Sequence, residues 1–382
     1  MTDAAPDTYL VINAGSSSIK WGLYRADDLT PLEHKTIEVK GKDGYAPAVE
    51  EICKLIETRS VKGVGHRVVH GGRDYSEPKL IDAKVFADLE KLKPLAPLHQ
   101  PHNLKAVKLI QEKHPELPQV ACFDTAFHRT QPRINQIYAL PRELTDEGII
   151  RYGFHGLSYE YIAEVLPQYA GETAKGRVIV AHLGNGASLC AMKDGKSVAT
   201  TMGFTPLDGL MMGTRTGAID PGIPLYLQQE KGMSVKSVSD IFQKSSGLKG
   251  VSGETEDVRT LLASDKPEAK EAIDLFCLYA ARQVASLTVD LGGLDALVFT
   301  AGIGENSDVI RQKICAHLEH LGVKTDDALN QAGGPAIGAK GSPVQVYVVK
   351  TDEELMMAQH VRELLQPKAP APAMRPAPKF AP

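Results

Sequence analysis

Two segments far apart in the chain share one pattern, and this repetition most constrains what the chain can fold into. The first, TYLVINAGSSSIKWGLY (8–24), combines an apolar strand, a turn of small residues and a second strand. The second, RVIVAHLGNGASLCAMKDGKSV (177–198), repeats this order about 170 residues later. Turns of Gly, Asn and Ser are common, so two unrelated hairpins are the alternative explanation. We favour a duplicated domain, because both turns follow an apolar strand in the same way.

Short β-branched runs alternate with segments of helical periodicity along the chain. We expect strands at residues 9–13, 64–70, 119–124, 177–183, 296–302 and 344–349, and helices at residues 46–59, 102–114 and 270–292. This alternation predicts an α/β protein with layered sheets. The last helix is apolar on more than one face, so we expect it to be buried between other elements.

The composition is that of a globular protein and excludes several classes. The 382 residues are 43% hydrophobic and 24% charged, enough for two or three domains. The net charge of −4 and the lack of a basic run argue against nucleic acid as a partner. Five cysteines lie far apart without a C-x-x-C pair, which argues against a zinc ribbon or a disulfide framework. With neither a signal peptide nor an apolar run of 18 residues, we expect a cytoplasmic protein without a membrane partner.

The C-terminal segment differs in composition from the rest. Residues 367–382, PKAPAPAMRPAPKFAP, contain six prolines and five alanines. Proline removes backbone donors and fixes the backbone in extended geometry, so we expect a disordered tail there.

The first turn, GSSSIK, is a candidate phosphate site. It is not a Walker A loop, because a second strand follows it instead of a helix. The N–H groups and serine hydroxyls of a hairpin tip can still converge on an anion. Lys20 would add a positive charge, and Asn13 at the end of the strand would orient a metal-bound water. The residues alone leave an ordinary hairpin and a phosphate site equally open.

Two further turns are rich in glycine. In AHLGNGAS, Gly184 and Gly186 allow close backbone approach to a ligand, and Asn185 tolerates a left-handed conformation. His182 would donate to a phosphoryl oxygen, with a buried structural histidine as the alternative. FTAGIGENS (299–307) offers bare backbone to a base or ribose. Three such turns in one chain favour a nucleotide site more than any one of them does.

Arginines and carboxylates complete the candidate chemistry. Arg73 and Arg215 stand among glycines, which predicts that they project into a cleft toward carboxylate or phosphate oxygens. A surface ion pair is the alternative for each. Asp124 and Glu353 follow apolar strands and suit Mg²⁺, which takes one or two carboxylates plus phosphates and waters. Together these features predict phosphoryl transfer, in which catalysis is mostly positioning and charge stabilisation.

Longer motifs bring in a family resemblance. They occur in the family's order from about residue 8 to residue 365: VINAGSSSIKWGLY, GHRVVHGG, LAPLHQPHN, CFDTAFH, RYGFHGLS, VIVAHLGNGAS, DGLMMGTRTGAIDPG, TAGIGENS and KTDEELMMAQ. On these motifs the chain resembles the acetate and propionate kinase family, the acetokinase branch of the sugar kinase, Hsp70 and actin fold. The resemblance covers nearly the whole chain.

The resemblance implies an α/β fold of two duplicated ribonuclease-H-like domains with a nucleotide cleft between them. It places an N-terminal domain at 1–148, completed by the C-terminal helix 353–366, and a nucleotide-binding domain at 149–352. It also suggests a homodimer in the cytoplasm.

The implied reaction is reversible, Mg²⁺-dependent transfer from ATP to acetate, giving ADP and acetyl phosphate, with Mn²⁺ as an alternative ion. We expect direct in-line transfer instead of a phospho-enzyme. Propionate or another short acid is the alternative substrate, because one methylene in an apolar pocket is worth only about 1–3 kcal/mol. Leu98 and the region of Pro224 are our candidates for the discriminating surface.

Residue by residue, the resemblance implies four groups. The catalytic group is Asp124, Arg73, Arg215, His155 and His182. Arg73 and His99 would bind the substrate, and Asn13 and Glu353 the metal. Nucleotide-binding residues would be Ser16, Ser18, Lys20, His182, Leu183, Gly184, Asn185, Gly186, Asp257, Val258, Arg259, Gly302, Ile303, Gly304, Glu305 and Asn306. Leu157 and Tyr159 stand where the family more often has threonine and histidine, which puts the fine shape around His155 in doubt.

Overall fold

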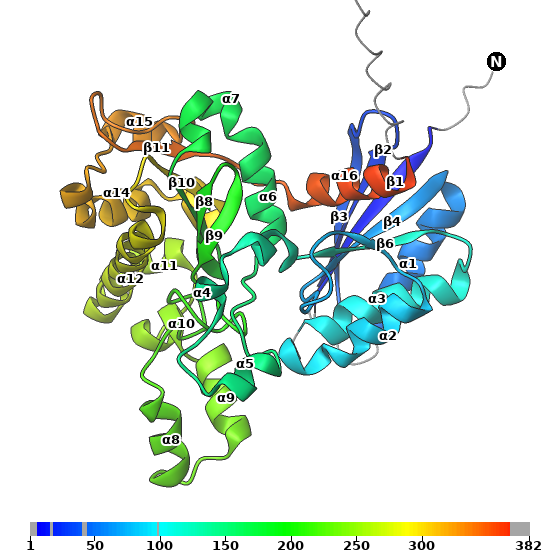
Figure 1. The fold of residues 1–382 in the computed structure, drawn as a ribbon, viewed down its shortest axis with the longest axis horizontal. Helices are drawn as coiled ribbons and strands as arrows, with labels where there is room; N and C mark the ends of the chain where they lie inside the picture. The colour runs from blue at the N-terminus through cyan, green and yellow to red at the C-terminus, as the bar shows by residue number, and fades with distance from the viewer. Residues whose placement is uncertain (1–5, 16–17, 40–43, 98, 367–382) are drawn as a thin grey trace, which may run out of the picture.

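Two mixed β-sheets, each covered by helices, lie side by side in the computed structural model (Figure 1). It describes residues 6–15, 18–39, 44–97 and 99–366. The predicted tail 367–382, Ser16 and Leu98 therefore lie outside the described residues.

The first sheet has the strand order β3-β2-β1-β4-β6-β5. β1, β2 and β3 form an antiparallel meander, while β4 runs parallel to β1 and β6 parallel to β4. Its strands are β1 Thr8–Ala14, β2 Ser18–Arg25, β3 Pro31–Glu38, β4 Val61–Val68, β5 Lys79–Leu80 and β6 Gln119–Phe123.

The second sheet repeats this plan in the order β11-β10-β7-β8-β9. β7, β8 and β9 form the meander, and β10 and β11 continue in parallel from β7. Its strands are β7 Val178–Leu183, β8 Ala187–Lys193, β9 Lys196–Thr200, β10 Ala296–Thr300 and β11 Gln345–Val348. The two hairpins seen in the sequence thus hold equivalent places, which confirms the duplication.

The helices fall into two sets along the chain. Before β7 they are α1 Tyr45–Thr58, α2 Ala83–Lys91, η1 Lys93–Leu95, α3 Gln100–Lys113, η2 Ala126–Thr130, α4 Arg133–Gln136, α5 Arg142–Asp146, α6 Gly156–Val165, α7 Pro167–Ala170 and η3 Gly171–Lys175. After β9 they are α8 Gly222–Gln229, α9 Val235–Lys244, α10 Gly247–Ser252, α11 Val258–Ala263, α12 Pro267–Leu291, α13 Ala301–Asn306, α14 Asp308–His317, η4 Glu319–Leu321, α15 Asp327–Ala332 and α16 Glu353–Leu365.

All nine predicted strands and helices are present, with one correction at the end of a strand. The strand expected to reach residue 302 ends at Thr300, and the next six residues form α13. Ala301 has a φ of 63°, a left-handed conformation that turns the chain out of the sheet at this point.

Helices from opposite ends of the chain cover the first sheet. The buried positions of α1, spaced by three and four residues, pack on one face together with α3. α16, the last helix, packs on the other face (red in Figure 1). β4 allows this close approach because it carries glycine where α16 passes. A Cβ on Gly63 would collide with Leu365 Cδ1, and one on Gly65 would lie 2.9 Å from Val361 Cγ2.

The chain crosses to the second sheet earlier than predicted. Directly after β6, the Thr130 hydroxyl donates to Ser197 O at 2.8 Å, and Asn135 Nδ2 donates to Val198 O at 3.0 Å. η2 also packs against β9 and α6. The boundary predicted at residue 148 therefore comes after the crossing. The chain returns between β11 and α16.

α12 is the core helix of the second half. Among the described residues it is the one helix whose length and composition would allow it to span a membrane. Its apolar residues instead pack against β8, α10, α11 and α14, and Ile273, Phe276 and Val284 are fully enclosed. The expectation of a buried helix is confirmed.

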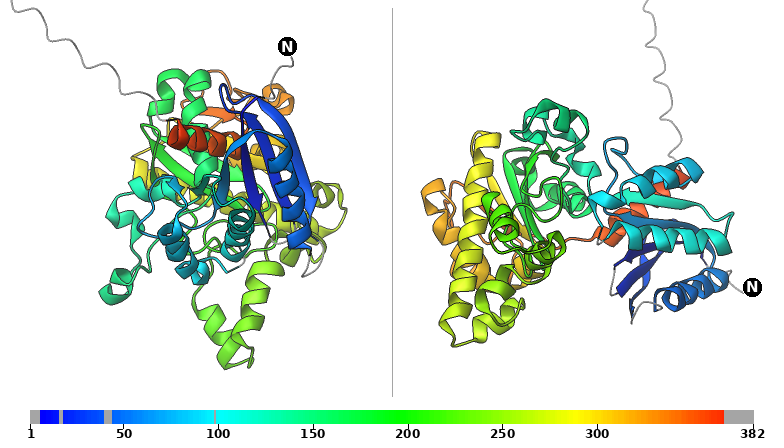
Figure 2. Two further views of the ribbon diagram at one scale, coloured as in Figure 1. Left: turned by 90° about the vertical axis from the view of Figure 1, so that its right-hand side faces the viewer. Right: turned by 90° about the horizontal axis from the view of Figure 1, so that it is seen from below.

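A helical hairpin formed by α8 and α9 projects from the second half (Figures 1 and 2). α8 has no buried residue, and α9 has one, Val238. Apolar side chains stand in solvent here: Leu225 is 55% exposed, Tyr226 52% and Val235 72%.

Candidate active site

Polar side chains gather where three strands of the first sheet end, beside the start of α16. Asn13 and Arg67 are the next-to-last residues of β1 and β4, and Asp124 follows β6. The parallel pairing brings these strand ends to one edge of the sheet. Asn13 lies on the same face as Val11, two positions earlier, and Val11 packs against α16. Glu353, the first residue of α16, therefore meets this edge.

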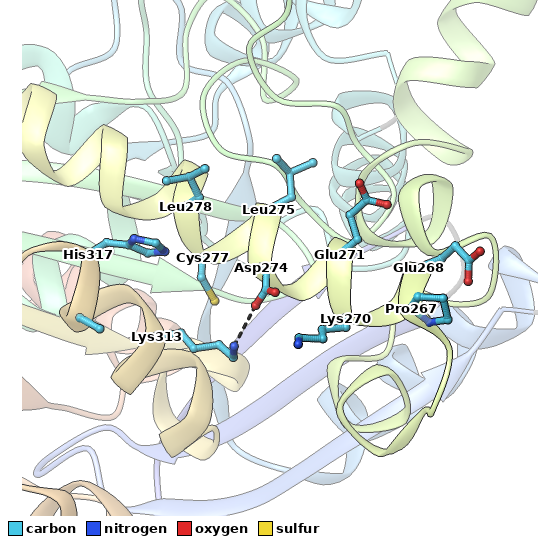
Figure 3. A pocket seen from close by; sticks show the side chains of 11 residues that line it. Pro267, Glu268, Lys270, Glu271, Asp274, Leu275, Cys277, Leu278, Lys313 and His317 are labelled. Carbon is cyan, nitrogen blue, oxygen red and sulfur yellow. Dashed lines mark hydrogen bonds and ion pairs between the residues drawn. The ribbon is translucent and has the colours of Figure 1, made fainter.

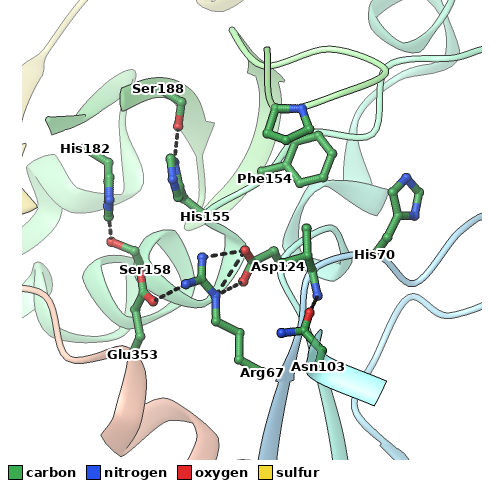
Figure 4. A network of polar contacts seen from close by, with 12 residues as sticks. Arg67, His70, Asn103, Asp124, Phe154, His155, Ser158, His182, Ser188 and Glu353 are labelled. Carbon is green, nitrogen blue, oxygen red and sulfur yellow. Dashed lines mark hydrogen bonds and ion pairs between the residues drawn. The ribbon is translucent and has the colours of Figure 1, made fainter. Parts of the chain in front are cut away.

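Arg67 and Asp124 form the centre of this cluster (Figure 4). Arg67 Nε lies 2.9 Å from Asp124 Oδ1 and Nη2 lies 2.6 Å from Oδ2, while Nη1 is 3.8 Å from Glu353 Oε2. Burial raises the pKa of the Asp124 carboxyl, and the charge of Arg67 opposes that shift. Burial lowers the pKa of Arg67, but Asp124 and Glu353 outweigh it and raise the pKa overall. The two-pronged geometry is that of an ionised pair.

Arg73, predicted to reach the cleft, lies instead on the surface. Its guanidinium donates to Asp146 O at 2.7 Å and to Thr145 O at 3.3 Å. Within the described residues it makes no hydrogen bond to the cluster around Asp124. The arginine of this segment that does enter the cluster is Arg67, which the sequence analysis missed.

Arg215 faces the cluster from the second half. Its Nη1 donates to Pro206 O at 2.8 Å, and it forms no ion pair within the described part of the chain. Burial, and then the charge of Arg67, lower the pKa of Arg215. A Cβ added to Gly186 would lie 3.4 Å from His155 Nε2 and 3.5 Å from Arg215 Nη2. The glycine turn, the imidazole and the guanidinium therefore border one space, and two arginines with few carboxylates make it attractive to an anion.

His155 and His182 stack with ring centroids 4.2 Å apart and planes 15° apart. His155 Nδ1 lies 2.8 Å from Ser188 Oγ, and His182 Nδ1 lies 2.8 Å from Ser158 Oγ. Burial, then the proximity of His182, and then the charge of Arg67 hold the pKa of His155 well below its ordinary value. Burial and Arg67 lower the pKa of His182 to about 3. Both rings are therefore neutral at neutral pH.

Leu157 and Tyr159 lie in the first turn of α6, directly after His155. Leu157, on α6, is 1% exposed and packs in the core beneath α16. The Tyr159 hydroxyl lies 2.5 Å from Ser188 Oγ, behind His155. His155 itself has a φ of 59° and caps the start of α6, a left-handed conformation uncommon for histidine.

His99 lies at the start of α3 beside the arginines. Burial, followed by the charges of Arg215 and Arg67, lowers its pKa to about 4. Two side-chain amides of α3 bond to the backbone just after β4. Asn103 accepts the Val69 N–H and donates to Ala14 O. Gln100 accepts the His70 N–H and donates to His70 O. α3 thus ties the first turn to the strand that carries Arg67.

The first glycine–serine turn is described in part. Ser16 falls outside the described residues. Ser18 begins β2, and its carbonyl accepts the Gly15 N–H at 2.8 Å. Lys20 is exposed and pairs with Asn13 across the hairpin.

The two other turns line one cleft of about 860 Å³ in the second half. Eight predicted nucleotide-binding residues border it: Gly184, Asn185, Asp257, Val258, Arg259, Gly302, Ile303 and Asn306. Thr255, Glu256, Leu262, Ala263, Ser307 and Asp308, which the sequence did not single out, complete the wall. Asp257 caps α11 and pairs with Arg259 at 2.6 Å, and Arg259 is 91% exposed. Leu183 and Gly304 are buried and do not border the cleft.

Glu305 also turns away from this cleft. Its Oε1 accepts the Ala301 N–H at 2.8 Å and the Thr351 N–H at 3.1 Å. It therefore ties the start of α13 to the segment that returns to the first half. Thr351 in turn donates to Ser158 Oγ at 2.8 Å, next to His182.

A second groove of about 860 Å³ lies between α12 and α14 (Figure 3). Lys313 and Asp274 pair across it at 2.8 Å. None of the predicted site residues borders it.

A divalent cation fits the donors near Arg67, although the described residues contain no group of three or more His, Cys, Asp or Glu able to hold a metal ion. Asp124 is bound to Arg67, which leaves the Glu353 carboxylate and the Asn13 amide. Mg²⁺ is typically held by one or two carboxylates together with phosphates and waters. This donor set suits an ion that arrives with a phosphate group.

A profile described as the acetokinase family matches residues 33–359. The chain belongs to the acetokinase family. An acetate kinase of Rhodopseudomonas palustris is 49% identical over 94% of this chain and 98% of its own length. An acetate kinase of Nitrobacter hamburgensis is 48% identical over 94% of this chain and 96% of its own length.

Solved structures of this acetokinase family agree with the fold. A propionate kinase from Francisella tularensis superposes with a TM-score of 0.86 at 39% identity, covering 94% of this chain and 99% of that one. The acetate kinase of Porphyromonas gingivalis gives 0.85 at 35% identity, covering 94% and 100%. The predicted duplicated, actin-like α/β fold is confirmed.

Several residues of the site escaped the sequence analysis of this acetokinase. Ser158, Ser188 and Thr351 act on the histidines through hydroxyls that look like ordinary polar positions in the sequence. A signal existed for Arg67, because a charged residue one position before the end of a buried strand must face a polar edge.

Proposed function

We propose that this chain is an acetate kinase that transfers a phosphoryl group in line between ATP and acetate, giving ADP and acetyl phosphate in a reversible reaction. The observation that carries the proposal is the space bordered by Arg215, His155 and the Gly186 turn, with Arg67 close enough for its charge to lower the pKa of His155. Membership of the acetokinase family, with acetate kinases at up to 49% identity, supports the substrate.

The reaction needs positioning and positive charge more than proton transfer. An acetate oxygen forms the new bond to the γ-phosphorus while the bond to the β,γ-bridging oxygen breaks and ADP leaves. The nucleophile is already an anion at neutral pH, so no side chain need act as a base. Arg215 and Arg67 would offset the charge of the transferring group. His155 and His182, both neutral, would donate hydrogen bonds to its equatorial oxygens.

Arg67 takes the role expected of Arg73 in this proposal. The fork between Arg67 and Asp124 leaves Nη1 as the nitrogen least engaged with that carboxylate, and it points toward Glu353. Asp124 would then orient Arg67 instead of touching the substrate. His99, beside both arginines, remains the candidate for a second contact to the acid.

The methyl group of acetate would meet Val69 and Phe154. Both are buried in one apolar cluster next to the Arg67 strand. Pro224 lies on the projecting helix α8 and has no part in this surface, while Leu98 falls outside the described residues. Propionate remains the alternative, because the Francisella tularensis relative is a propionate kinase.

Asn13 and Glu353 would hold Mg²⁺, or Mn²⁺ as an alternative. The ion would neutralise charge on the β- and γ-phosphate oxygens when bound. Ser16, Ser18 and Lys20 would approach the same phosphates from the first hairpin. The cleft bordered by Gly184, Asn185, 257–259 and 302–306 would hold the adenosine end.

The two halves would act as domains that close on the nucleotide. The crossing after β6 moves our boundaries to 1–124 with 353–366 for the first domain and 125–352 for the second. Glu305 and Leu183 would support the nucleotide site from behind instead of touching ATP.

A homodimer in the cytoplasm fits the surface and the cysteines. The exposed apolar residues of α8 and α9, including Leu225 and Tyr226, form the surface we propose for self-association. All five cysteines are free thiols and buried, as suits a reducing compartment.

Trapping acyl phosphate as the hydroxamate tests the proposal directly. Purified protein with ATP and Mg²⁺ should give acetyl hydroxamate, and acetate should be preferred over propionate in kcat/KM. A higher kcat/KM for propionate would select the alternative. No trapped product with any short acid would refute the kinase.

A further inference from the structure

Two short chains of hydroxyl groups end on the stacked histidines. In the first, Tyr159 OH lies 2.5 Å from Ser188 Oγ, which lies 2.8 Å from His155 Nδ1. In the second, Thr351 Oγ1 lies 2.8 Å from Ser158 Oγ, which lies 2.8 Å from His182 Nδ1. Figure 4 shows the two serines bonded to the two rings. Each ring is therefore held at Nδ1 and leaves Nε2 for another partner.

Tyr159 sets the direction of the first chain. It is fully buried, and Ser188 is its one hydrogen-bond partner among the described residues. Leaving a buried hydroxyl proton without an acceptor is costly, so Tyr159 donates to Ser188. Ser188 must then direct its own proton to His155 Nδ1. The second chain has the same order, because Thr351 donates to Ser158, which can then donate to His182 Nδ1.

Because both rings are neutral, the direction of these hydrogen bonds decides which ring nitrogen carries the proton. A neutral imidazole has one proton, so an Nδ1 that accepts a hydrogen bond leaves the proton on Nε2. His155 Nε2 borders the space shared with Gly186 and Arg215. Neither Nε2 has a hydrogen-bond partner among the residues that the structure describes.

We propose that Ser188 with Tyr159, and Ser158 with Thr351, are positioning residues that fix His155 and His182 as Nε2–H tautomers, so that both rings present a donor to an oxyanion. The use of that donor rests on the proposed function, but the tautomer does not. In the opposite tautomer each ring would turn a lone pair toward the negatively charged phosphoryl group and repel it.

The tautomers can be read without activity. Histidine ¹⁵N spectra of the ligand-free protein distinguish protonated from unprotonated ring nitrogens, and His155→Gln and His182→Gln assign the signals. We expect both rings to be protonated at Nε2. Ser188→Ala should turn His155 into a mixture of tautomers and leave His182 unchanged, while Ser158→Ala should do the reverse. Protonation of either ring at Nδ1 in the wild type would overturn the proposal.

Kinetics separate positioning from a merely structural effect. Ser188→Ala should lower kcat by about tenfold, because only the fraction of His155 that keeps its proton on Nε2 can donate to the transition state, while both KM values stay within about threefold. Tyr159→Phe, which removes one oxygen, should lower kcat by about three- to tenfold. Tyr161→Phe is the matched control on the same helix, since this hydroxyl has no hydrogen bond in the described residues, and it should leave kcat unchanged.

The outcomes are distinguishable from failure of the kinase proposal. Wild-type protein that shows Nε2–H tautomers but makes no acyl phosphate refutes the function and retains the inference. An active kinase whose Ser188→Ala variant keeps its tautomer and its kcat refutes the inference. Circular dichroism and ADP binding confirm that each variant is folded, and the wild-type spectrum tests the tautomers without any variant.

Discussion

Arg67, on the neighbouring strand β4, donates hydrogen bonds to both carboxylate oxygens of Asp124. Its Nε lies 2.9 Å from Oδ1 and its Nη2 lies 2.6 Å from Oδ2. Asp124 is 1% exposed, and both of its carboxylate oxygens accept hydrogen bonds from Arg67. The pair is an oriented cation at the end of a strand. A carboxylate committed in this way is a poor general base, which agrees with a reaction whose nucleophile is already an anion.

The two arginines of one segment provide a matched test. We expect Arg67→Ala to lower kcat/KM by at least about 100-fold, because a charge that offsets the transferring phosphoryl group is lost. Arg73→Ala should remain within about threefold, since its guanidinium binds the carbonyls of Asp146 and Thr145 at the surface. The hydroxamate assay measures both. The reverse ranking would restore Arg73 to the site.

Glu353 and Glu354 offer a second matched pair. Glu353→Gln should raise the Mg²⁺ concentration needed for half-maximal activity by about tenfold or more, because a carboxylate ligand becomes a weaker amide ligand. Glu354 pairs with His34 at 2.7 Å on the other side of the helix start, so Glu354→Gln should leave the Mg²⁺ dependence unchanged. Chelation with EDTA should abolish activity in the wild type and in both variants. Equal Mg²⁺ curves for the two variants would remove Glu353 from the metal site.

Gly186→Ala tests the space between His155 and Arg215. Gly186 does not have a positive φ, so alanine can adopt its backbone conformation. The added methyl would enter the space about 3.4 Å from His155 Nε2, where we place the phosphoryl group. We expect kcat to fall by about tenfold or more, with the melting temperature within about 2 °C of the wild type. Full activity would show that phosphate does not occupy this space.

Buried neutral histidines predict that acid destabilises the fold before the carboxylates titrate. Burial lowers the pKa of His66, His70 and His128 to about 4 each, from an ordinary value of 6.5. Between these values the unfolded chain binds more protons than the folded chain. Stability is therefore complete above about pH 6.5 and is lost as the pH falls toward 4. Each histidine contributes a slope of up to about 1.4 kcal/mol per pH unit.

Urea unfolding at pH 7 and pH 5 measures this effect. The free energy of unfolding should be lower at pH 5, and the difference should shrink in His66→Gln. His66 bonds to Gln119 Oε1 at 2.7 Å, so the amide can keep a donor there. A free energy independent of pH across this range would contradict the prediction.

The sequence predicted what depends on local pattern and failed where tertiary contacts decide. Short β-branched apolar runs identified the strands and the duplication, because a buried strand needs such a run whatever surrounds it. The choice between Arg67 and Arg73 depended on which face of β4 meets α16, a relation between residues almost 300 positions apart. The glycines around Arg73 predicted locally that its side chain enters a cleft, but in the folded chain this side chain lies on the surface.

Two other differences have the same origin. Ala301 leaves the strand through a left-handed φ that Glu305 stabilises by accepting its N–H, and no propensity predicts that conformation for alanine. Residues after Asp124 join the second sheet through hydrogen bonds to Ser197 and Val198. A boundary taken from a family resemblance does not detect such bonds.

The position of α16 at the end of the chain determines when the first half can complete its hydrophobic core. Its apolar face covers Val11 and Val120, so that side of the first sheet stays open while the ribosome makes the whole second half. The N-terminal half can close this face only after residues 353–365 have emerged. Glu353 arrives on the same helix, so a nascent chain would complete its hydrophobic core and the carboxylate beside Arg67 in one late event.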